Sequence, residues 1–594
     1  MSAGAFLAEP FRMAIVQSNF MRKPAIMAVL ALVAAAAAAR EPVRARHAMV
    51  VAQEPLAADV GAEILKSGGN AIDAAVAVAF ALAVTHPSAG NLGGGGFLLA
   101  RFADGRAAFI DFREMAPLAA SRDMYIGPDG KATGDSLLGW RAAAVPGTVR
   151  GLELAHSRYG SRPWAELVAP AIRLAAQGVA LSYAEARSLC GARTRLAQFA
   201  ESRRIFLKDG ACYEPGEVLR QPELARTLER IARHGARDFY EGETARILAE
   251  EMKAHGGLIT LEDLRGYRAL EREPLRGSYR GYAILTAPPP SSGGIGILQM
   301  LGMLEGTGYE KHGAGSAASL HWIAEAMRRF FADRAEYLGD TDFARVPVRG
   351  LLDPAYIASR RATIRPDRAT PSRELGAGRP PQESEDTTHF NVIDAAGNAV
   401  ALTCTINNSY GSAAAVPRLG FLLNNEMDDF AVQPGKPNMF GLIQGEANAI
   451  APRKRPLSAM TPAIVEKDGR LVMALGAPGG PRIISGVLQV LLHVIDFGMD
   501  IQQAVDQPRI HHQWMPDRLY HERGLSPDTL ALLRQRGHEL AETYAVGSVE
   551  AIMVEEPRVR SVEDATTKGA NVTDRIRWLA AAQNGRSAGK ASGY

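Results

Sequence analysis

The chain has 594 residues with a formal net charge of +3, and 47% of its residues are hydrophobic against 22% that are charged. This composition excludes gross disorder and allows a large buried core, and the even mixture of acids and bases gives no argument for a nucleic-acid partner. The sequence contains neither a C-x-x-C nor an H-E-x-x-H motif, so it predicts no metal site.

The N-terminal segment has the pattern of a secretory signal. The basic pair Arg22 and Lys23 precedes a short apolar run that ends in small residues. We interpret residues 1–39 as a signal peptide, with Met21 as a candidate for the true start. The run is shorter than the roughly 20 residues of a membrane-spanning helix, although a membrane anchor is the alternative. We therefore expect a periplasmic or secreted protein with no stable membrane span.

Three cysteines occur in the chain. In an exported protein Cys190 and Cys212 either form a disulfide or stay as two thiols, and the sequence leaves both possibilities open. Cys404 falls inside a predicted strand without a neighbouring histidine or basic residue. Packing is therefore its expected role, rather than nucleophilic chemistry.

The first part of the chain is predicted to be mainly helical. Apolar residues at helical spacing predict helix over residues 56–86, with a break at Gly68–Gly69, and over most of 147–270. Another helix is expected at Ile295–Glu305, after the loop PPPSSGGIG. Strands are expected in GNLGGGGFLLARF and RAAFIDFREMAP. The glycine-rich turn lacks the Lys-Ser/Thr of a phosphate-binding loop, so we interpret it as close backbone packing.

The composition changes between residues 340 and 386. The stretch PDRATPSRELGAGRPPQESED is rich in proline, charge and small residues, which predicts an exposed linker. From Thr387 onward the pattern is one of strands with tight turns. The position 386/387 thus divides a helix-rich large segment, 40–386, from a strand-rich small segment, 387–594.

A hairpin is predicted directly after this boundary, formed by THFNVID and NAVALTCTI with AAGN at the tip. A hairpin centred on Ala396 places Thr387 opposite Thr405, about 5 Å apart on one face, and Asn407 shares that face. A threonine hydroxyl is a weak nucleophile, but the α-amine of an N-terminal threonine can act as its base. Thr387 becomes a candidate nucleophile if the bond after Asp386 is cut. An ordinary threonine pair at a strand edge is the alternative.

Three later motifs carry further candidates. The segment LLNNEMDDF predicts a short turn with three acids, Glu426, Asp428 and Asp429. These acids suit an ammonium group, although a solvated loop explains them equally well. In KRPLSAMTP, Ser458 lies near basic residues. In ALGAPGGPRI, the adjacent amides of Gly479 and Gly480 either point at a developing oxyanion or form an ordinary turn.

Seven stretches together resemble the motifs of the γ-glutamyltransferases, members of the N-terminal nucleophile hydrolase superfamily: GNLGGGGF, DFREMAP, DTTHFNV, TINNSYG, LLNNEMDDF, KRPLSAM and GAPGGPRII. The resemblance runs from about Ala48 to Val549. It implies an α/β fold, a four-layer αββα sandwich, and a precursor that cleaves itself between Asp386 and Thr387. The large and small chains would then form a heterodimer.

The resemblance also implies a role for each candidate residue. Thr387 is the expected nucleophile, oriented by Thr405. Gly479 and Gly480 are expected to form the oxyanion hole. The remaining residues would hold the substrate: its α-carboxylate would bind to Arg113 and Ser458, and its α-ammonium would bind to Asn407, Glu426 and Asp429. The expected donors are glutathione and other γ-glutamyl compounds, and the acceptors are water, amino acids or peptides. No cofactor is expected.

Several positions depart from the family pattern and bear on substrate range. Ala459 replaces the second serine of PLSSM, Ala477 and Pro481 turn GSPGGSRI into GAPGGPRI, and the tail lacks GASDPR. Within QPGKPNMFGLIQGEANA, the expected lid over the pocket, Phe440 replaces a tyrosine that in relatives bonds to the asparagine matching Asn407. We expect a lid held less firmly, unless Phe440 packs well enough to replace that bond.

Two other functions compete with this interpretation. A cephalosporin acylase of the same superfamily takes glutaryl groups, which lack the α-ammonium, so the retention of Glu426 and Asp429 favours a glutamyl donor. A non-catalytic exported binding protein would not need Thr387, Thr405 and the glycine pair. Self-cleavage into two chains distinguishes an active enzyme from such a protein.

Overall fold

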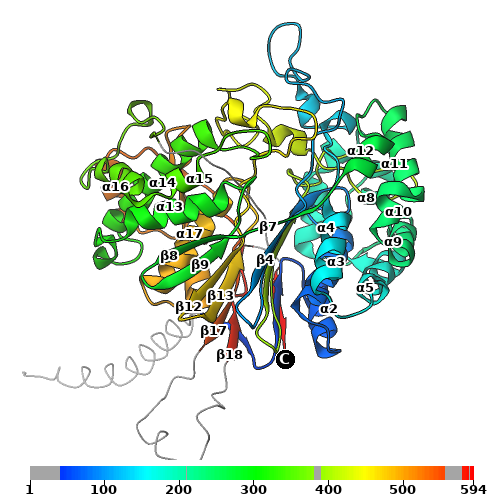
Figure 1. The fold of residues 1–594 in the computed structure, drawn as a ribbon, viewed down its shortest axis with the longest axis horizontal. Coiled ribbons are helices and arrows are strands. Elements are labelled where there is room, and N and C mark those ends of the chain that lie inside the picture. The colour runs from blue at the N-terminus through cyan, green and yellow to red at the C-terminus, as the bar shows by residue number, and fades with distance from the viewer. Residues whose placement is uncertain (1–39, 209, 380–389, 556–577, 587–588) are drawn as a thin grey trace, which may run out of the picture. The chain divides into compact units, whose positions relative to one another are not determined.

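The computed structural model describes residues 40–208, 210–379, 390–555, 578–586 and 589–594, and Pro42–Tyr594 form a compact unit (Figure 1). The expected signal peptide and the Asp386–Thr387 bond lie outside the described residues. None of the helices in those ranges combines the length and the apolar character that a bilayer crossing requires.

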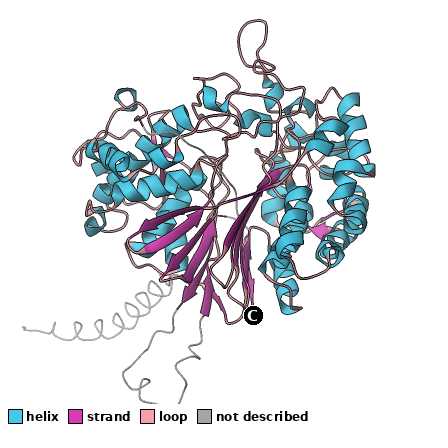
Figure 2. Ribbon diagram, viewed as in Figure 1, coloured by secondary structure: helices cyan, strands magenta, loops and turns pink. Residues whose placement is uncertain are grey.

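Two antiparallel sheets face each other in this unit, and their central strands are in contact (Figure 2). Among the described residues, the first sheet has seven strands in the order β1 (Val43–Ala45), β18 (Trp578–Ala581), β17 (Glu550–Glu555), β13 (Arg470–Gly476), β12 (Ala463–Lys467), β9 (Tyr282–Thr286) and β8 (Leu275–Tyr279). The second, within the same ranges, has the order β19 (Lys590–Gly593), β2 (Met49–Ala52), β10 (Phe390–Ile393), β11 (Ala399–Thr405), β3 (Gly95–Arg101), β4 (Ala107–Asp111) and β7 (Leu270–Arg272).

Helices cover the outer face of each sheet (Figure 1). The layer over the second sheet consists of α2 (Pro55–Lys66), α3 (Ala71–Thr85), α4 (Thr148–Tyr159), α5 (Trp164–Gln177), α9 (Pro222–His234), α10 (Ala236–Glu241), α11 (Glu243–Ala254) and α12 (Leu261–Gly266). The layer over the first consists of α13 (Gly293–Leu304), α14 (Ala317–Tyr337), α15 (Val348–Leu351), α16 (Pro354–Ala362), α17 (Arg482–Ile495), α18 (Ile501–Asp506) and α19 (Pro527–Gln535). The predicted four-layer αββα sandwich is therefore confirmed.

Smaller elements complete the unit. Three short helices form a separate cap: α6 (Tyr183–Gly191), α7 (Arg193–Leu196) and α8 (Ala200–Phe206). The remaining strands are β5 (Val179–Ala180), which pairs with β6 (Val218–Leu219), and β14 (Ile510–His511), β15 (Leu519–His521) and β16 (Leu540–Glu542), which form a small sheet.

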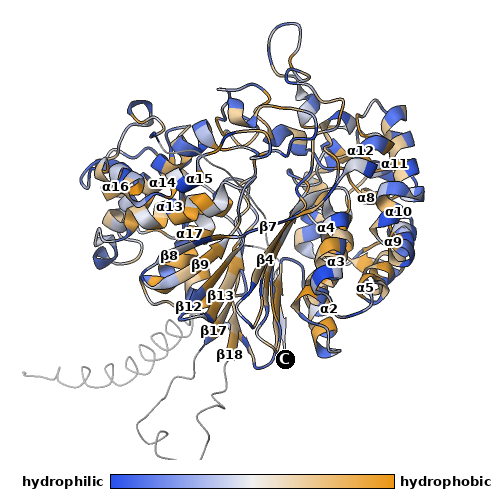
Figure 3. Cartoon of the chain, in the orientation of Figure 1, coloured by the Kyte–Doolittle hydropathy of each residue, from blue (hydrophilic) through white to orange (hydrophobic). Residues whose placement is uncertain are grey.

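The hydrophobic pattern explains the layers. In β3, Phe97 and Leu99 point into the core between the sheets, whereas Leu98 packs toward the helices on the other face, as the two-residue period of a strand requires. Helix α3 is buried along its whole length because α2, α5 and the second sheet surround it. A capping box between Asn70 and Asp73 fixes its start, and the predicted break at Gly68–Gly69 separates it from α2. In Figure 3 the strands of both sheets are accordingly coloured mostly as hydrophobic residues, and the outer helices and loops carry most of the hydrophilic ones.

The division at 386/387 does not separate two folding units. Each sheet contains strands from both sides of that position, so the large and small segments are interleaved. Helix is dense between residues 148 and 266, as predicted, but the first segment also supplies edge strands to both sheets.

In the part that the structure describes, the predicted linker is exposed at residues such as Asp367 and Glu374, but the prediction is wrong for a few buried residues within it. Thr370 and Ser372 are buried; the hydroxyl of Thr370 donates to the Glu325 carboxylate at 2.6 Å, and the carbonyl of Ser372 accepts from Trp514 Nε1 at 3.0 Å. Proline and charge are typical of exposed loops, but buried partners distant in sequence satisfy the polar groups of this segment.

The cysteine alternatives are also resolved. Cys190 and Cys212 form a disulfide that joins α6 to the chain after α8. Cys404 is a free thiol in β11, and burial raises its pKa to about 12, so it stays protonated near neutral pH. Packing is therefore its role, as expected.

Candidate active site

The predicted hairpin register is confirmed over the described residues. Strands β10 and β11 pair with Phe390 opposite Leu402 and Asn391 opposite Ala401, which is the register of a hairpin centred on Ala396. Thr387 lies outside the described residues, so its position opposite Thr405 stays a prediction.

Thr405 ends β11 and is fixed by close contacts. Its Oγ1 accepts a hydrogen bond from the amide of Asn407 at 2.7 Å, and its carbonyl accepts from Asn91 Nδ2 at 2.8 Å. A Cβ at Gly94 would lie 1.9 Å from that carbonyl oxygen, so only glycine fits there. The expected close packing of the glycine-rich turn is thereby confirmed, and it positions Thr405.

Asn407 adopts a left-handed backbone conformation, with φ of 68°, directly after the strand. Its Nδ2 donates to the carbonyl of Asn425 at 3.0 Å, and Asn425 Oδ1 accepts from the amide of Asn408 at 3.0 Å. The buried amide of Asn425 thus joins the end of β11 to the acidic turn. Sequence reasoning missed this link, although the NN pair in LLNNEMDDF carries it.

Arg113 gathers three carboxylates around one guanidinium. Its Nη1 lies 2.8 Å from Glu426 and 3.3 Å from Glu114, and its Nη2 lies 2.5 Å from Asp429. The side chains of Arg113 and Glu426 are 1% and 0% exposed, whereas that of Asp429 is 16% exposed. Asp429 is therefore the accessible member of this cluster, and Glu426 supports it from behind.

The charges in this cluster do not balance. Burial raises the pKa of Glu426 and of Glu114 against the opposing attraction of Arg113. Burial disfavours the charged form of Arg113 too, but the surrounding carboxylates outweigh it and raise the pKa of the guanidinium. Three carboxylates thus surround one guanidinium, and Asp429 is the carboxylate that a cationic ligand can reach.

Ser458 is buried beside this cluster. Its carbonyl accepts from Ser292 Oγ at 2.8 Å, and its amide donates to Pro290 at 3.2 Å. Arg113 Nε donates to the carbonyl of Pro456 at 3.2 Å, which ties the guanidinium to the same loop. The expected pair of Arg113 and Ser458 therefore sits on adjoining walls of the site.

Gly479 and Gly480 form the turn between β13 and α17. Their φ values of 136° and 57° lie in the region that favours glycine, and Pro481 precedes the first turn of the helix. The partial positive charge of a helix N-terminus adds to any anion-stabilising effect of amides in this turn. These φ values explain why glycine occupies both positions, and the role of the two amides as an oxyanion hole stays a prediction.

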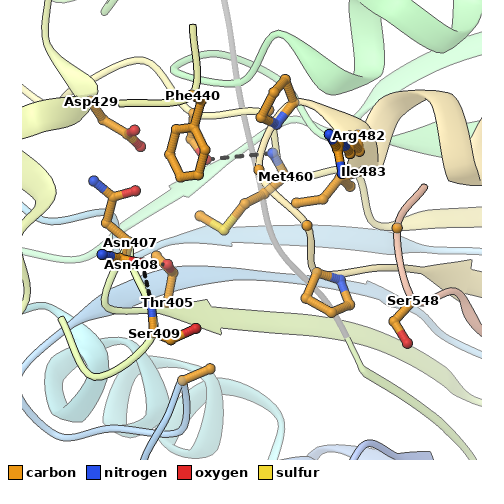
Figure 4. Close-up of a pocket in the computed structure, with 18 of the residues that line it drawn as sticks. Thr405, Asn407, Asn408, Ser409, Asp429, Phe440, Met460, Arg482, Ile483 and Ser548 are labelled. Carbon is orange, nitrogen blue, oxygen red and sulfur yellow. Dashed lines mark hydrogen bonds between the residues drawn. The ribbon is translucent and has the colours of Figure 1, made fainter. Parts of the chain in front are cut away.

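These residues surround a cavity of about 530 Å³ (Figure 4). The predicted site residues on its wall are Arg113, Thr405, Asn407, Asp429, Ser458, Gly479 and Gly480. Residues not foreseen from the sequence also line it: Arg334, Met460, Arg482, Tyr544, Ser548 and Arg586. No cluster of His, Cys, Asp or Glu with metal-binding geometry occurs in the described ranges.

The expected lid lies over this cavity. Phe440 lines it, and a Cβ built on Gly480 would come within 3.0 Å of the Phe440 ring. The carbonyl of Phe440 accepts from Gln513 Nε2 at 3.1 Å, while its amide donates to Asn438 Oδ1 at 3.0 Å. Apolar packing and backbone bonds hold Phe440 here, which favours the alternative that it replaces the tyrosine bond.

Facing sheets between helical layers, with a polar cavity at the end of the central hairpin, define a hydrolase of the N-terminal nucleophile type. The γ-glutamyltranspeptidase family model matches residues 57–573. The glutathione hydrolase proenzyme of Escherichia coli strain K12 is 46% identical over 562 residues, which cover 91% of this chain and 96% of that protein. The chain belongs to the γ-glutamyltranspeptidase family, and it is an enzyme.

Acylases are related to this chain as well. The acylase ACY 1 proenzyme of Pseudomonas sp. strain V22 is 40% identical over 522 residues, with 86% of this chain and 91% of that protein covered. The crystal structure of cephalosporin acylase from Bacillus halodurans matches with a TM-score of 0.80 at 27% identity, covering 93% of this chain and 97% of that one. The acylases form a related branch of the same fold.

Proposed function

We propose that this enzyme transfers the γ-glutamyl group of glutathione and related compounds to water or to an amino acid or peptide, with Thr387 as nucleophile. The observation that carries the proposal is one cavity with an amino-acid-binding side and a glycine turn. Asp429, Asn407 and the Arg113–Ser458 pair line it together with Gly479 and Gly480.

The α-carbon of a γ-glutamyl group carries one carboxylate and one ammonium. Arg113 and Asp429 form an ion pair at 2.5 Å. In the proposed complex this pair opens, so that the substrate carboxylate lies on Arg113 and its ammonium on Asp429. Each protein charge then keeps a partner of opposite sign, which avoids leaving a buried ion unpaired. Asn407 and Ser458 supply polar atoms on either side.

The chemistry follows from an N-terminal threonine. The hydroxyl of Thr387 attacks the γ-carbonyl carbon while its own α-amine takes the proton. The amides of Gly479 and Gly480 stabilise the oxyanion, and the proton passes to the leaving amine as the C–N bond breaks. A γ-glutamyl ester remains on Thr387, and water or an acceptor amine then cleaves it. Thr405 positions the nucleophile.

The nucleophile requires a cut between Asp386 and Thr387. The Thr387 hydroxyl attacks the carbonyl of Asp386 and the C–N bond breaks, which frees the α-amine and leaves an ester; water then hydrolyses this ester and separates the two chains. The products are a large chain, about 40–386, and a small chain, 387–594. Since each sheet pairs strands of the large segment with strands of the small one, the two chains would stay together as a heterodimer.

Export to the periplasm or the exterior fits this function. The basic pair and apolar run within residues 1–39 support a signal peptide, and the Cys190–Cys212 disulfide fits an oxidising compartment. A glutaryl acylase is the second candidate, because acylases share the fold and much of the sequence. The accessible carboxylate of Asp429 favours the glutamyl donor, since a glutaryl group has no ammonium to meet it.

Intact-mass and N-terminal analysis of the purified protein tests the proposal. The wild type should yield a small chain that begins at Thr387, and it should release glutamate from glutathione. Thr387→Ala should remain a single inactive chain, whereas Thr405→Ala should cleave slowly. Normal maturation of purified Thr387→Ala would remove Thr387 from the mechanism.

A further inference from the structure

The cavity wall carries several arginines, and most are already committed. Arg113 is ion-paired with Glu426 and Asp429. Arg586 contacts Glu522 at 2.6 Å and donates to the carbonyl of Val505 at 2.7 Å. Neither has a free charge to offer a second anionic group of a substrate.

Arg482 differs from both. It is half-buried on the cavity wall, and no carboxylate of the described residues lies within 4.0 Å of its guanidinium. Its Nη1 donates to Thr543 Oγ1 at 2.7 Å and to the carbonyl of Ala545 at 3.2 Å. Nε and Nη2 make no hydrogen bond within the described ranges. A half-buried guanidinium that has two nitrogen atoms without a hydrogen bond, and no ion-pair partner among the described residues, matches a carboxylate ligand.

The position of Arg482 indicates which carboxylate. It follows Gly480 by two residues and begins α17, so it lies next to the proposed oxyanion turn. Figure 4 shows Arg482 and Ser548 on one side of the pocket, and Asp429 and Asn407 on the opposite side. The α-carbon end of a γ-glutamyl group belongs with Asp429. What lies beyond the scissile amide therefore extends toward Arg482.

Neighbouring groups suit the end of a peptide. Ser548 Oγ accepts from Asn584 Nδ2 at 3.0 Å, and its own proton has no acceptor among the described residues. Tyr544 also lines the cavity, and its large aromatic side chain is 88% exposed. A cation, a hydroxyl donor and an open aromatic ring together fit a short peptide that ends in a carboxylate.

We propose that Arg482, assisted by Ser548, binds the C-terminal carboxylate of the group on the far side of the scissile amide. This group is the cysteinylglycine portion of glutathione before cleavage and a carboxylate-ended amino acid or dipeptide during transfer. The inference rests on the proposed function and adds a specificity site to it. It predicts that the enzyme prefers donors and acceptors with a free carboxylate at this end.

Two donor substrates distinguish carboxylate binding by Arg482 from a purely structural role of this residue. Glutathione has a carboxylate on its leaving group, whereas γ-glutamyl-p-nitroanilide has none. In Arg482→Gln, kcat/KM for glutathione should fall by about 10- to 150-fold more than kcat/KM for the anilide, the range for a lost charge-assisted hydrogen bond, with the effect mainly in KM. Arg482→Lys should recover part of the loss because it keeps the charge.

The matched control is Arg523→Gln, which removes an arginine that is 87% exposed and paired with Glu542 outside the cavity; it should change neither donor. The acceptor side is tested with glycylglycine against glycylglycine amide, and the preference for the free acid should disappear in Arg482→Gln. Equal losses on both donors, or an unchanged acceptor preference, would mean that Arg482 only braces the loop at Thr543 and Ala545. Failure of the wild type on both donors would instead reject the proposed function.

Discussion

The ring of Phe440 lies against Gly480: a Cβ at residue 480 would stand 3.0 Å from Cε1 of Phe440. The lid and the proposed oxyanion turn are therefore in contact, and the shape of one restricts the other. Gln513 reinforces this contact by donating to the carbonyl of Phe440. The position of the lid and the geometry of the turn should change together.

We expect Gly480→Ala to lower kcat/KM at least about tenfold, because the added methyl group displaces Phe440 and strains a backbone with φ of 57°. Gly469→Ala is the matched control: its φ is 72°, so the strain is similar, but nothing lies within 4 Å of an added Cβ. Activity assays on the two variants and on Gly480→Ala/Phe440→Ala check this. If the double variant regains no activity, the contact with Phe440 is not the cause.

The hairpin and the layered fold could be predicted because their signals are local or shared by a family. The alternation of β-forming residues around AAGN fixed the register that pairs Phe390 with Leu402. The Arg113 cluster could be assembled only by resemblance, since 316 positions separate Arg113 from Asp429. Its direct ion pair was not foreseen, because no local pattern states which charges meet.

The missed residues have a common physical origin. Arg482 and Tyr544 are brought together by the return of the chain after α19. Arg482 belongs to the motif GAPGGPRII, but the motif does not state what its side chain meets, and no motif contains Tyr544. The burial of Thr370 and Ser372 was missed for the same reason: their partners, Glu325 and Trp514, are distant in sequence. Composition and periodicity carry no information on polar contacts between residues that are distant in sequence.

Asp428 gives stability a specific pH dependence. Burial raises the pKa of this carboxyl to about 7, although Ser136 Oγ donates to it at 2.9 Å. Between about pH 4 and 7 the folded state keeps a proton that the unfolded chain releases, so the free energy of unfolding falls as pH rises through that window. Above it the penalty is constant, with an upper limit of roughly 4 kcal/mol at 1.36 kcal/mol per pK unit.

We expect Asp428→Asn, which cannot ionise, to gain stability relative to the wild type as the pH is raised from 5 to 8. Urea denaturation of both proteins at the two pH values measures the difference. The exposed Asp367 provides the control, since Asp367→Asn should follow the wild type at each pH. A pH-independent difference between Asp428→Asn and the wild type would contradict the argument.

The Cys190–Cys212 disulfide should stabilise the cap of α6 to α8 and, through it, the chain after Asn407. Arg195 donates to the carbonyl of Ser409 at 2.8 Å, and Ser202 Oγ donates to that of Ala413 at 2.6 Å. The two cysteines are 22 positions apart, and closing a loop of this length adds about 3 kcal/mol to the free energy of unfolding in the chain-entropy model.

We therefore expect Cys190→Ser/Cys212→Ser to unfold at lower denaturant concentration and to exchange amide hydrogens faster across residues 409–415. Reduction of the wild type should have the same effect. Cys404→Ser is the comparison, because that thiol has no disulfide partner. Unchanged exchange across residues 409–415 in the double variant would show that the cap does not depend on the disulfide.

Asp429 should decide between glutamyl and glutaryl donors. It is the accessible carboxylate of the Arg113 cluster and, in the proposed binding mode, meets the ammonium that a glutaryl group lacks. Asp429→Asn removes that partner, and a charge-assisted hydrogen bond is worth about 1.5–3 kcal/mol, so kcat/KM for γ-glutamyl-p-nitroanilide should fall by about 10- to 150-fold. The same change releases Nη2 of Arg113 from its ion pair, which leaves the guanidinium freer for a carboxylate. The kcat/KM for glutaryl-p-nitroanilide should therefore fall less, or rise.

Glu446→Gln, which neutralises an exposed carboxylate paired with Arg122, is the control and should affect neither donor. Parallel assays of both anilides give the ratio directly, and an equal loss on the two would mean that Asp429 supports Arg113 without contacting the ammonium.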